Sequence, residues 1–153
     1  MIVRIILFLI INFIALAIGG FFTGDGAASA WYQELNKAPW TPPGWVFGAA
    51  WSFIMICFAF YMAMALGKLN SKKSLLIIFS IQWILDVGWN PVFFYLHEIE
   101  FGLLIILGLT FLIGYILVHY KSKLGYISFL ILPYFVWLII ASSLNAYIFF
   151  MNP

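Results

Sequence analysis

Charged residues divide the sequence into five apolar segments, each close to the length that a membrane-spanning helix requires. Such a helix needs about 20 predominantly apolar residues. Helices are predicted because lipid offers no partners for backbone polar groups and the sequence has no alternating β-barrel pattern. The expected helices cover residues 5–22, 44–66, 75–96, 102–119 and 124–150. The sequence therefore predicts an all-α integral membrane protein with a five-transmembrane-helix bundle in one domain over residues 1–153.

The first apolar segment resembles a secretory signal peptide in having Arg4 before it. Its apolar run is longer than that of a typical signal peptide, and Ala28-Ser29-Ala30 lies beyond a glycine-rich stretch. We therefore expect this segment to be an uncleaved helix.

Basic residues are distributed unevenly between the predicted loops. With five spans, six basic residues and no acidic ones lie on the side of the N-terminus, whereas the other side carries Lys37 and four acidic residues. Lys and Arg concentrate in cytoplasmic loops, so the N-terminus is predicted inside and the C-terminus outside. This arrangement suits a bacterial cytoplasmic membrane, and an outer membrane is the alternative that the sequence leaves open.

The composition narrows the class of protein further. Hydrophobic residues make up 66% of the chain and charged residues 8%, and mean hydropathy is +1.12. These values exclude an ordinary soluble domain, and a net charge of +2 is too small for a nucleic-acid-binding surface. Cys57 is the only cysteine, and His97 and His119 have no ligand-spaced partners. We therefore expect no disulfide, no metal site and no obligatory cofactor.

The longest connection between predicted helices covers residues 23–43 and is rich in aromatic residues and proline. Long connections in compact domains are commonly lids or binding loops. Proline fixes φ and removes an N–H donor, so Pro39, Pro42 and Pro43 can stiffen this loop without making it helical. We interpret residues 23–43 as a lid.

The third predicted helix carries a polar and aromatic stripe, with spacing i, i+4, i+7, i+8 and i+11, formed by Gln82, Asp86, Trp89, Asn90 and Phe93. These positions share one helix face. Asp86 lies near the middle of the span, where an ionisable group is costly and normally faces the bundle interior. Two interpretations stay open: Asp86 lines a polar pocket or moves protons, or it is a protonated structural residue bonded across helices.

The last predicted helix has a comparable face, formed by Tyr134, Trp137, Ala141, Leu144 and Asn145. Pro133 is expected to kink this helix. Trp51, Trp89 and Trp137 lie too deep for the interfacial belt, and a deep indole N–H needs a partner, which either packing or a ligand would supply. The faces together predict a cavity for a flat, largely apolar ligand with a polar edge.

Three ordered motifs resemble those of the TspO/MBR family. The loop motif is Trp31-Tyr32-x-x-Leu35-x-Lys37-x-Pro39-Trp40-x-Pro42-Pro43-Gly44-Trp45, followed by Trp51. The second motif is Gln82-x-x-x-Asp86-x-x-Trp89-x-Pro91-x-Phe93-Phe94. The third is Pro133-Tyr134-x-x-Trp137-x-x-x-Ala141-x-x-Leu144-Asn145. The resemblance spans nearly the whole chain and has the same predicted helix count.

The resemblance implies a membrane receptor, often a homodimer, that binds porphyrins such as protoporphyrin IX between its helices. It also implies binding of isoquinoline carboxamide and benzodiazepine-type synthetic ligands and, in some members, cholesterol. Carried over by motif, the ligand-binding residues are Tyr32, Pro42, Trp51, Asp86, Trp89, Phe93, Trp137, Ala141 and Leu144. The resemblance further associates Trp51 and Trp137 with light-dependent porphyrin degradation, which makes them the candidate catalytic residues. Transport of porphyrins or other small lipophilic molecules is the alternative function.

The chain departs from the family pattern at three places. Asp86 stands where the family usually has Asn, which changes the charge available to the cavity. Ala38 separates Lys37 from Pro39, where the family has a Lys-Pro pair. No basic residue follows Tyr147, so the sterol-type pattern at the end of the last helix is absent. A carboxylate would repel porphyrin propionates, so we expect Asp86 to be protonated or placed away from them.

Overall fold

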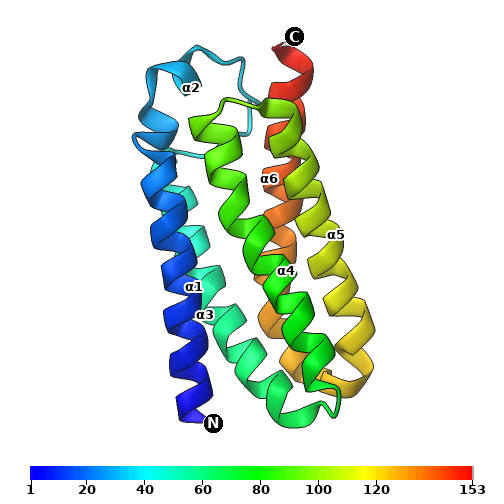
Figure 1. Cartoon of the computed structure of the whole chain (residues 1–153). Coiled ribbons are helices and arrows are strands. Elements are labelled where there is room, and N and C mark those ends of the chain that lie inside the picture. Colours follow the sequence, from blue (N-terminus) through cyan, green and yellow to red (C-terminus); the bar gives the residue numbers. More distant parts are fainter. Residues whose placement is uncertain (153) are drawn as a thin grey trace.

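The computed structural model describes residues 1–152, so the last residue of the expected 1–153 domain lies outside it. All regular secondary structure in the described chain is helical. The five long helices are α1 (Ile2–Thr23), α3 (Gly44–Lys68), α4 (Lys72–Asn90), α5 (Ile99–Leu124) and α6 (Leu132–Met151). The four short elements are η1 (Gly26–Ala28), α2 (Ala30–Glu34), η2 (Pro91–Tyr95) and η3 (Gly125–Ile131). The long helices lie side by side in one bundle, with the two chain termini at opposite ends (Figure 1).

Four segments of the described chain are long and apolar enough to cross a membrane. They are Ile2–Ala28, Gly44–Lys68, Lys72–Tyr95 and Ile99–Met151. The last segment contains α5, η3 and α6 and is more than twice as long as a single crossing needs. The protein is therefore an all-helical integral membrane protein by the length and composition of its helices.

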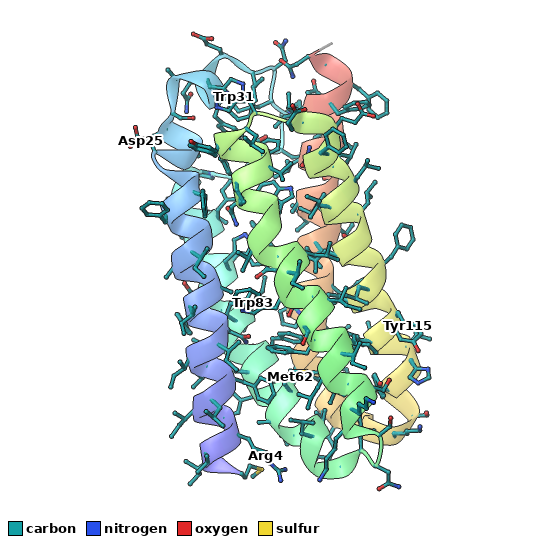
Figure 2. The ribbon with its side chains drawn as sticks, viewed as in Figure 1. Arg4, Asp25, Trp31, Met62, Trp83 and Tyr115 are labelled. Atoms are coloured by element: carbon teal, nitrogen blue, oxygen red, sulfur yellow. The ribbon has the colours of Figure 1, made fainter. Side chains whose placement is uncertain are left out.

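The outer surface of the bundle suits lipid rather than water. Phe21, Phe111 and Val118 are 82%, 77% and 77% exposed. Tyr115 on α5 also points away from the bundle, whereas Trp83 and Met62 point inward (Figure 2). A soluble monomer rarely exposes so much contiguous apolar surface.

Small residues allow the helices to pack closely inside the bundle. Ala59 and Ala63 on α3 are almost completely buried, so this row of small residues is used within the chain. A Cβ atom on Gly19 of α1 would lie 2.7 Å from Nδ2 of Asn90 on α4. Glycine at this position therefore lets α1 approach α4 closely.

A π-helix interrupts the helix expected over residues 75–96. Pro91 has no N–H with which to continue the α-helical bonding pattern, and α4 ends at the residue before it. The next turn is wider: the N–H of Leu96 donates to the carbonyl of Pro91 at 2.9 Å. This turn, η2, carries Phe93 and Phe94 to the cavity described below. Such π segments are frequent at functional sites.

The helix expected over residues 124–150 is divided in the structure, and the change of helix type lies beside Pro133. Residues Gly125–Ile131 form the 3₁₀ helix η3, and α6 begins at Leu132. Pro133 therefore lies in the first turn of α6, where its missing N–H costs no intrahelical hydrogen bond.

Candidate functional site

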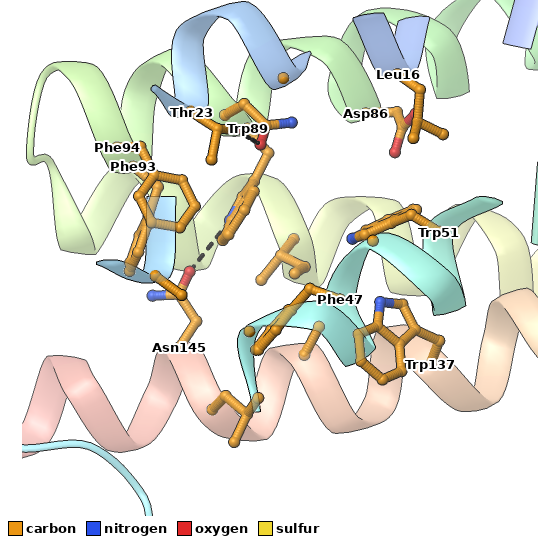
Figure 3. A pocket seen from close by; sticks show the side chains of 18 of the residues that line it. Leu16, Thr23, Phe47, Trp51, Asp86, Trp89, Phe93, Phe94, Trp137 and Asn145 are labelled. Atoms are coloured by element: carbon orange, nitrogen blue, oxygen red, sulfur yellow. Dashed lines mark hydrogen bonds between the residues drawn. The ribbon is translucent and has the colours of Figure 1, made fainter. Parts of the chain in front are cut away.

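An internal cavity lies between the long helices, beneath the lid (residues 23–43). Its volume is about 320 Å³, at the lower end of the range of small-molecule sites. Most lining side chains are apolar or aromatic and come from α1, α3, α4, η2 and α6, with Ala27 and Tyr32 from the lid. Figure 3 shows these side chains converging on one space. The arrangement offers stacking surfaces together with a few polar groups.

The structure brings eight of the nine predicted ligand-binding residues to this cavity. These are Tyr32, Trp51, Asp86, Trp89, Phe93, Trp137, Ala141 and Leu144. Pro42 is the exception, because it does not line the cavity. It lies two residues before the start of α3, whose Gly44 does line it. Ligand binding by the eight residues stays a prediction.

Two tryptophans and one carboxyl group form one end of the cavity, on the right in Figure 3. Trp137 is 8% exposed, and its indole Nε1 has no hydrogen-bond partner within residues 1–152. The Trp137 ring meets the ring of Phe47 edge to face, with centroids 5.6 Å apart. Trp51 packs in the same manner on Tyr134, at 5.8 Å. We call the group of Trp51, Asp86 and Trp137 the deep end of the cavity, because it lies farther from the lid than Phe93.

A chain of hydrogen bonds crosses from α4 to α6 behind the deep end. The amide Nε2 of Gln82 donates to the hydroxyl of Tyr134 at 2.8 Å. The Tyr134 hydroxyl in turn donates to Oδ1 of Asp86 at 3.2 Å. Gln82 and Tyr134 are almost fully buried, so this chain fixes the position of the carboxyl group.

Near the lid, a second polar bridge joins the same two helices. The indole Nε1 of Trp89 donates to Oδ1 of Asn145 at 3.1 Å, and Nδ2 of Asn145 donates to the carbonyl of Ile99 at 3.3 Å. The Trp89 ring stacks on the ring of Phe93 at 4.9 Å with an interplanar angle of 11°. This bridge presents a flat aromatic surface to the cavity.

The part of the lid nearest the cavity is held by local hydrogen bonds. Ser29 caps α2 by accepting from the backbone N–H of Tyr32 at 3.3 Å. The ammonium group of Lys37 donates to the carbonyls of Tyr32 and Gln33, both at 3.0 Å. Tyr32 is 5% exposed, and burial raises the pKa of its phenol above the ordinary value of 10.0. The Tyr32 hydroxyl is therefore neutral at physiological pH.

The far part of the lid is fastened to the end of α6. The backbone N–H of Asn36 donates to Oδ1 of Asn152 at 2.9 Å, and Nδ2 of Asn152 donates back to the carbonyl of Asn36 at 3.3 Å. Nδ2 of Asn36 also donates to the carbonyl of Met151 at 3.1 Å. Trp40 adds an indole hydrogen bond to Oγ of Ser143 at 3.2 Å. We call the reciprocal pair of Asn36 and Asn152 the lid clasp.

Several residues of the site were not predicted from the sequence. Phe47 lies four positions before Trp51 on the same helix face, so helical spacing could have identified it. Thr23, whose hydroxyl donates to Oδ1 of Asn90 at 2.7 Å, is the last residue of the apolar helix α1 and gives no such signal. The lid clasp joins residues that are 116 positions apart, which no local pattern reveals.

Metal ions in proteins are commonly held by clusters of His, Cys, Asp and Glu side chains. Within residues 1–152, no three His, Cys, Asp or Glu side chains lie close enough together to hold a metal ion. The chemistry that this part of the chain offers is stacking, apolar burial and hydrogen bonding.

These features define a class: a helical membrane protein with an internal, aromatic-lined cavity closed by a lid. Comparison with known families agrees with this class. The chain belongs to the TspO/MBR family, whose model matches residues 7–151.

Named relatives cover most of this chain. It is 29% identical over 147 residues to Protein CrtK of Rhodobacter capsulatus, a match that covers 94% of this chain and 91% of the relative. It is 33% identical over 138 residues to the tryptophan-rich protein TspO of Archaeoglobus fulgidus, covering 88% and 87%. It is 27% identical over 140 residues to the human translocator protein, covering 82% and 79%.

Proposed function

We propose that this protein is a membrane receptor that binds porphyrin-type tetrapyrroles in its central cavity. The observation that carries the proposal is the convergence of the aromatic rings of Trp51, Trp89, Phe93 and Trp137 on one lid-covered space. Flat macrocycles gain affinity from offset stacking and from apolar burial, which these rings supply. The few polar groups would orient the ligand rather than provide most of the affinity. Related synthetic ligands of the isoquinoline carboxamide or benzodiazepine type would occupy the same space.

The proposed membrane arrangement has five crossings, with α5 and α6 each crossing once. Arg4, Lys68, Lys72 and Lys73 belong to one end of the bundle, and the acidic Glu98 follows the opposite end of α4. The positive-inside tendency supports a cytoplasmic N-terminus and an external lid and C-terminus. Several of the similar proteins come from bacteria, which favours a bacterial cytoplasmic membrane.

The proposed assembly is a homodimer. The small residues Ala15 and Gly19 of α1 and Ala59 and Ala63 of α3 are buried within the chain and cannot form its interface. The dimer surface would therefore come from one of the apolar outer faces, where lipid covers the isolated chain.

A second candidate function is light-dependent porphyrin degradation. Trp51 and Trp137 both line the cavity, which would place two oxidisable indoles beside a photo-excited macrocycle. Transport is the alternative, and porphyrin flux into proteoliposomes compared with empty vesicles would separate it from binding alone.

The direct test is a titration of the purified protein with protoporphyrin IX in neutral detergent, in the dark, followed by tryptophan quenching. Saturable binding that weakens at least threefold in Trp137→Phe would support the receptor function. Trp45→Phe is the matched control, because Trp45 is 74% exposed and lies outside the cavity. Absence of saturable binding would contradict the proposal. Illumination of the complex then tests degradation: equal loss of the Soret band in the wild type, Trp51→Phe and Trp137→Phe would exclude a role for either indole.

A further inference from the structure

The charge of the cavity is unbalanced. Asp86 is its one charged lining residue within the described chain, and no Lys, Arg or His lines it. Lys37 is the basic residue of the lid, and its ammonium group is bonded to two backbone carbonyls. A ligand in this cavity therefore meets a carboxyl group without a protein counter-ion.

The carboxyl group of Asp86 is held in place, but most of its hydrogen-bond acceptor sites have no partner in the described part of the chain. Its Oδ1 accepts one hydrogen bond, from the Tyr134 hydroxyl at 3.2 Å, and that hydroxyl is committed on its other side to Gln82. A carboxylate has about four acceptor sites. No other side-chain donor within residues 1–152 reaches Asp86, so most of its acceptor capacity is available to a ligand.

Aromatic surfaces lie beside this carboxyl group. Trp51 and Trp137 line the same deep end, and Trp51 packs on the ring of Tyr134, whose hydroxyl bonds to Asp86 (Figure 3). Aromatic faces attract cations through the ring quadrupole, and tryptophan does so best. An acceptor carboxyl group in a cavity end that two indoles also line is a chemical arrangement that recognises an organic ammonium ion.

We propose that the deep end of the cavity binds a protonated amine carried by a flat aromatic body, with Asp86 accepting its charge-assisted hydrogen bond. Trp51 and Trp137 flank the ammonium group. The flat aromatic body stacks on the surface that Trp89 and Phe93 form near the lid. The inference rests on the proposed use of this cavity for ligand binding, and it does not require the ligand to be a porphyrin. Asp86 then determines the charge preferred at the deep end, favouring a cation there, so the propionates of a bound porphyrin would lie away from it.

Three probes with one ring system and different charge test the proposal. They are 9-(aminomethyl)anthracene, which is cationic at pH 7, neutral 9-anthracenemethanol, and anionic 9-anthracenecarboxylate. Their dissociation constants are measured in neutral detergent for the wild type, Asp86→Asn and Asp25→Asn. The Asp86→Asn substitution keeps an acceptor for the Tyr134 hydroxyl, so the fold is preserved, and a thermal unfolding scan checks this. Asp25→Asn removes an acidic residue that does not line the cavity.

In the wild type we expect the amine to bind at least tenfold more tightly than the carboxylate. In Asp86→Asn the amine should lose at least tenfold in affinity, the carboxylate should gain, and the neutral alcohol should change less than twofold. Asp25→Asn should match the wild type. The proposal is overturned if the amine, the alcohol and the carboxylate bind in the same order of affinity to the wild type and to Asp86→Asn.

A parallel titration with protoporphyrin IX separates this inference from the proposed function. Binding of protoporphyrin IX without Asp86-dependent amine binding contradicts the inference alone. Asp86-dependent amine binding without binding of protoporphyrin IX contradicts the porphyrin receptor alone. Failure of every probe to bind contradicts both.

Discussion

The indole N–H of Trp89 donates to the side-chain oxygen of Asn145 at 3.1 Å, which joins α4 to α6 beside the cavity. Asn145 is 2% exposed, and its amide also donates to a backbone carbonyl of α5. One side chain therefore connects three helices. Hydrogen bonds of this kind within membranes contribute about 0.6 kcal/mol on average, and up to about 1.7 kcal/mol.

Breaking this bridge should weaken helix association measurably. For Trp89→Phe and Asn145→Leu, a double-mutant cycle of the free energy of unfolding in mixed micelles should give a coupling energy of about 0.6–1.7 kcal/mol. Additive effects of the two substitutions would show that the hydrogen bond does not stabilise the folded chain.

The close approach of α1 and α4 predicts that Gly19→Ala is destabilising. The added methyl group would lie 2.7 Å from Nδ2 of Asn90, and the displaced amide would disturb the contact of Asn90 with Thr23. We expect a loss of about 1–3 kcal/mol in the free energy of unfolding. Gly20→Ala is the matched control, because nothing lies within 4 Å of its added Cβ. Gly19→Ala combined with Asn90→Ala should recover part of the loss, and no recovery would point to a different clash.

Removal of the Tyr134 hydroxyl should be costly because it leaves a buried amide without a partner. In Tyr134→Phe, the Nε2 group of Gln82 loses its hydrogen bond, while the Oε1 atom of Gln82 already has none within residues 1–152. We expect the free energy of unfolding to fall by about 1–3 kcal/mol. Tyr126→Phe, at a 70% exposed position, should leave stability unchanged. Addition of Gln82→Leu to Tyr134→Phe should restore part of the stability, because only Asp86 then lacks its partner, and a further loss would contradict this explanation.

The lid clasp predicts a kinetic effect on ligand exchange. Asn152→Ala removes the three hydrogen bonds between the Asn152 side chain and Asn36. Opening of the lid would then require about 0.7–1.4 kcal/mol less free energy, which corresponds to ligand dissociation about three- to tenfold faster. Stopped-flow measurement of tryptophan fluorescence recovery, with protoporphyrin IX as the ligand, would test this. Asn70→Ala, in the exposed connection between α3 and α4, is the control, and equal dissociation rates in the two variants would exclude the clasp as a barrier.

The sequence allowed the helical class and the cavity-facing stripes to be predicted because both depend on local periodicity. Asp86, Trp89 and Phe93 reach the cavity as their spacing indicates. The spacing did not predict the π-helix that follows Asn90. That turn depends on which carbonyl each N–H group reaches after Pro91, whose own N–H is missing, and residue spacing does not show this.

Other features depend on contacts between distant residues. The 3₁₀ helix η3 has an apolar composition like that of the adjoining helices, so hydropathy could not separate it from α6. Pro42 belongs to a family motif but does not line the cavity. It lies just before the start of α3, so its place in the motif relates to where this helix begins. The lid clasp could not be predicted from the sequence, because it depends on how the whole chain folds to bring Asn36 beside Asn152.

The lid clasp makes the two ends of the polypeptide unequal as places to attach a reporter. Asn152 directly follows α6 and is already bonded to Asn36 of the lid, whereas Met1 lies at the opposite end of the bundle (Figure 1). A fluorescent protein or an immobilisation tag joined after α6 would sit against the lid and compete with its hydrogen bonds. The same tag placed before α1 would lie at the end of the bundle away from the lid and would leave the hydrogen bonds of the lid clasp intact.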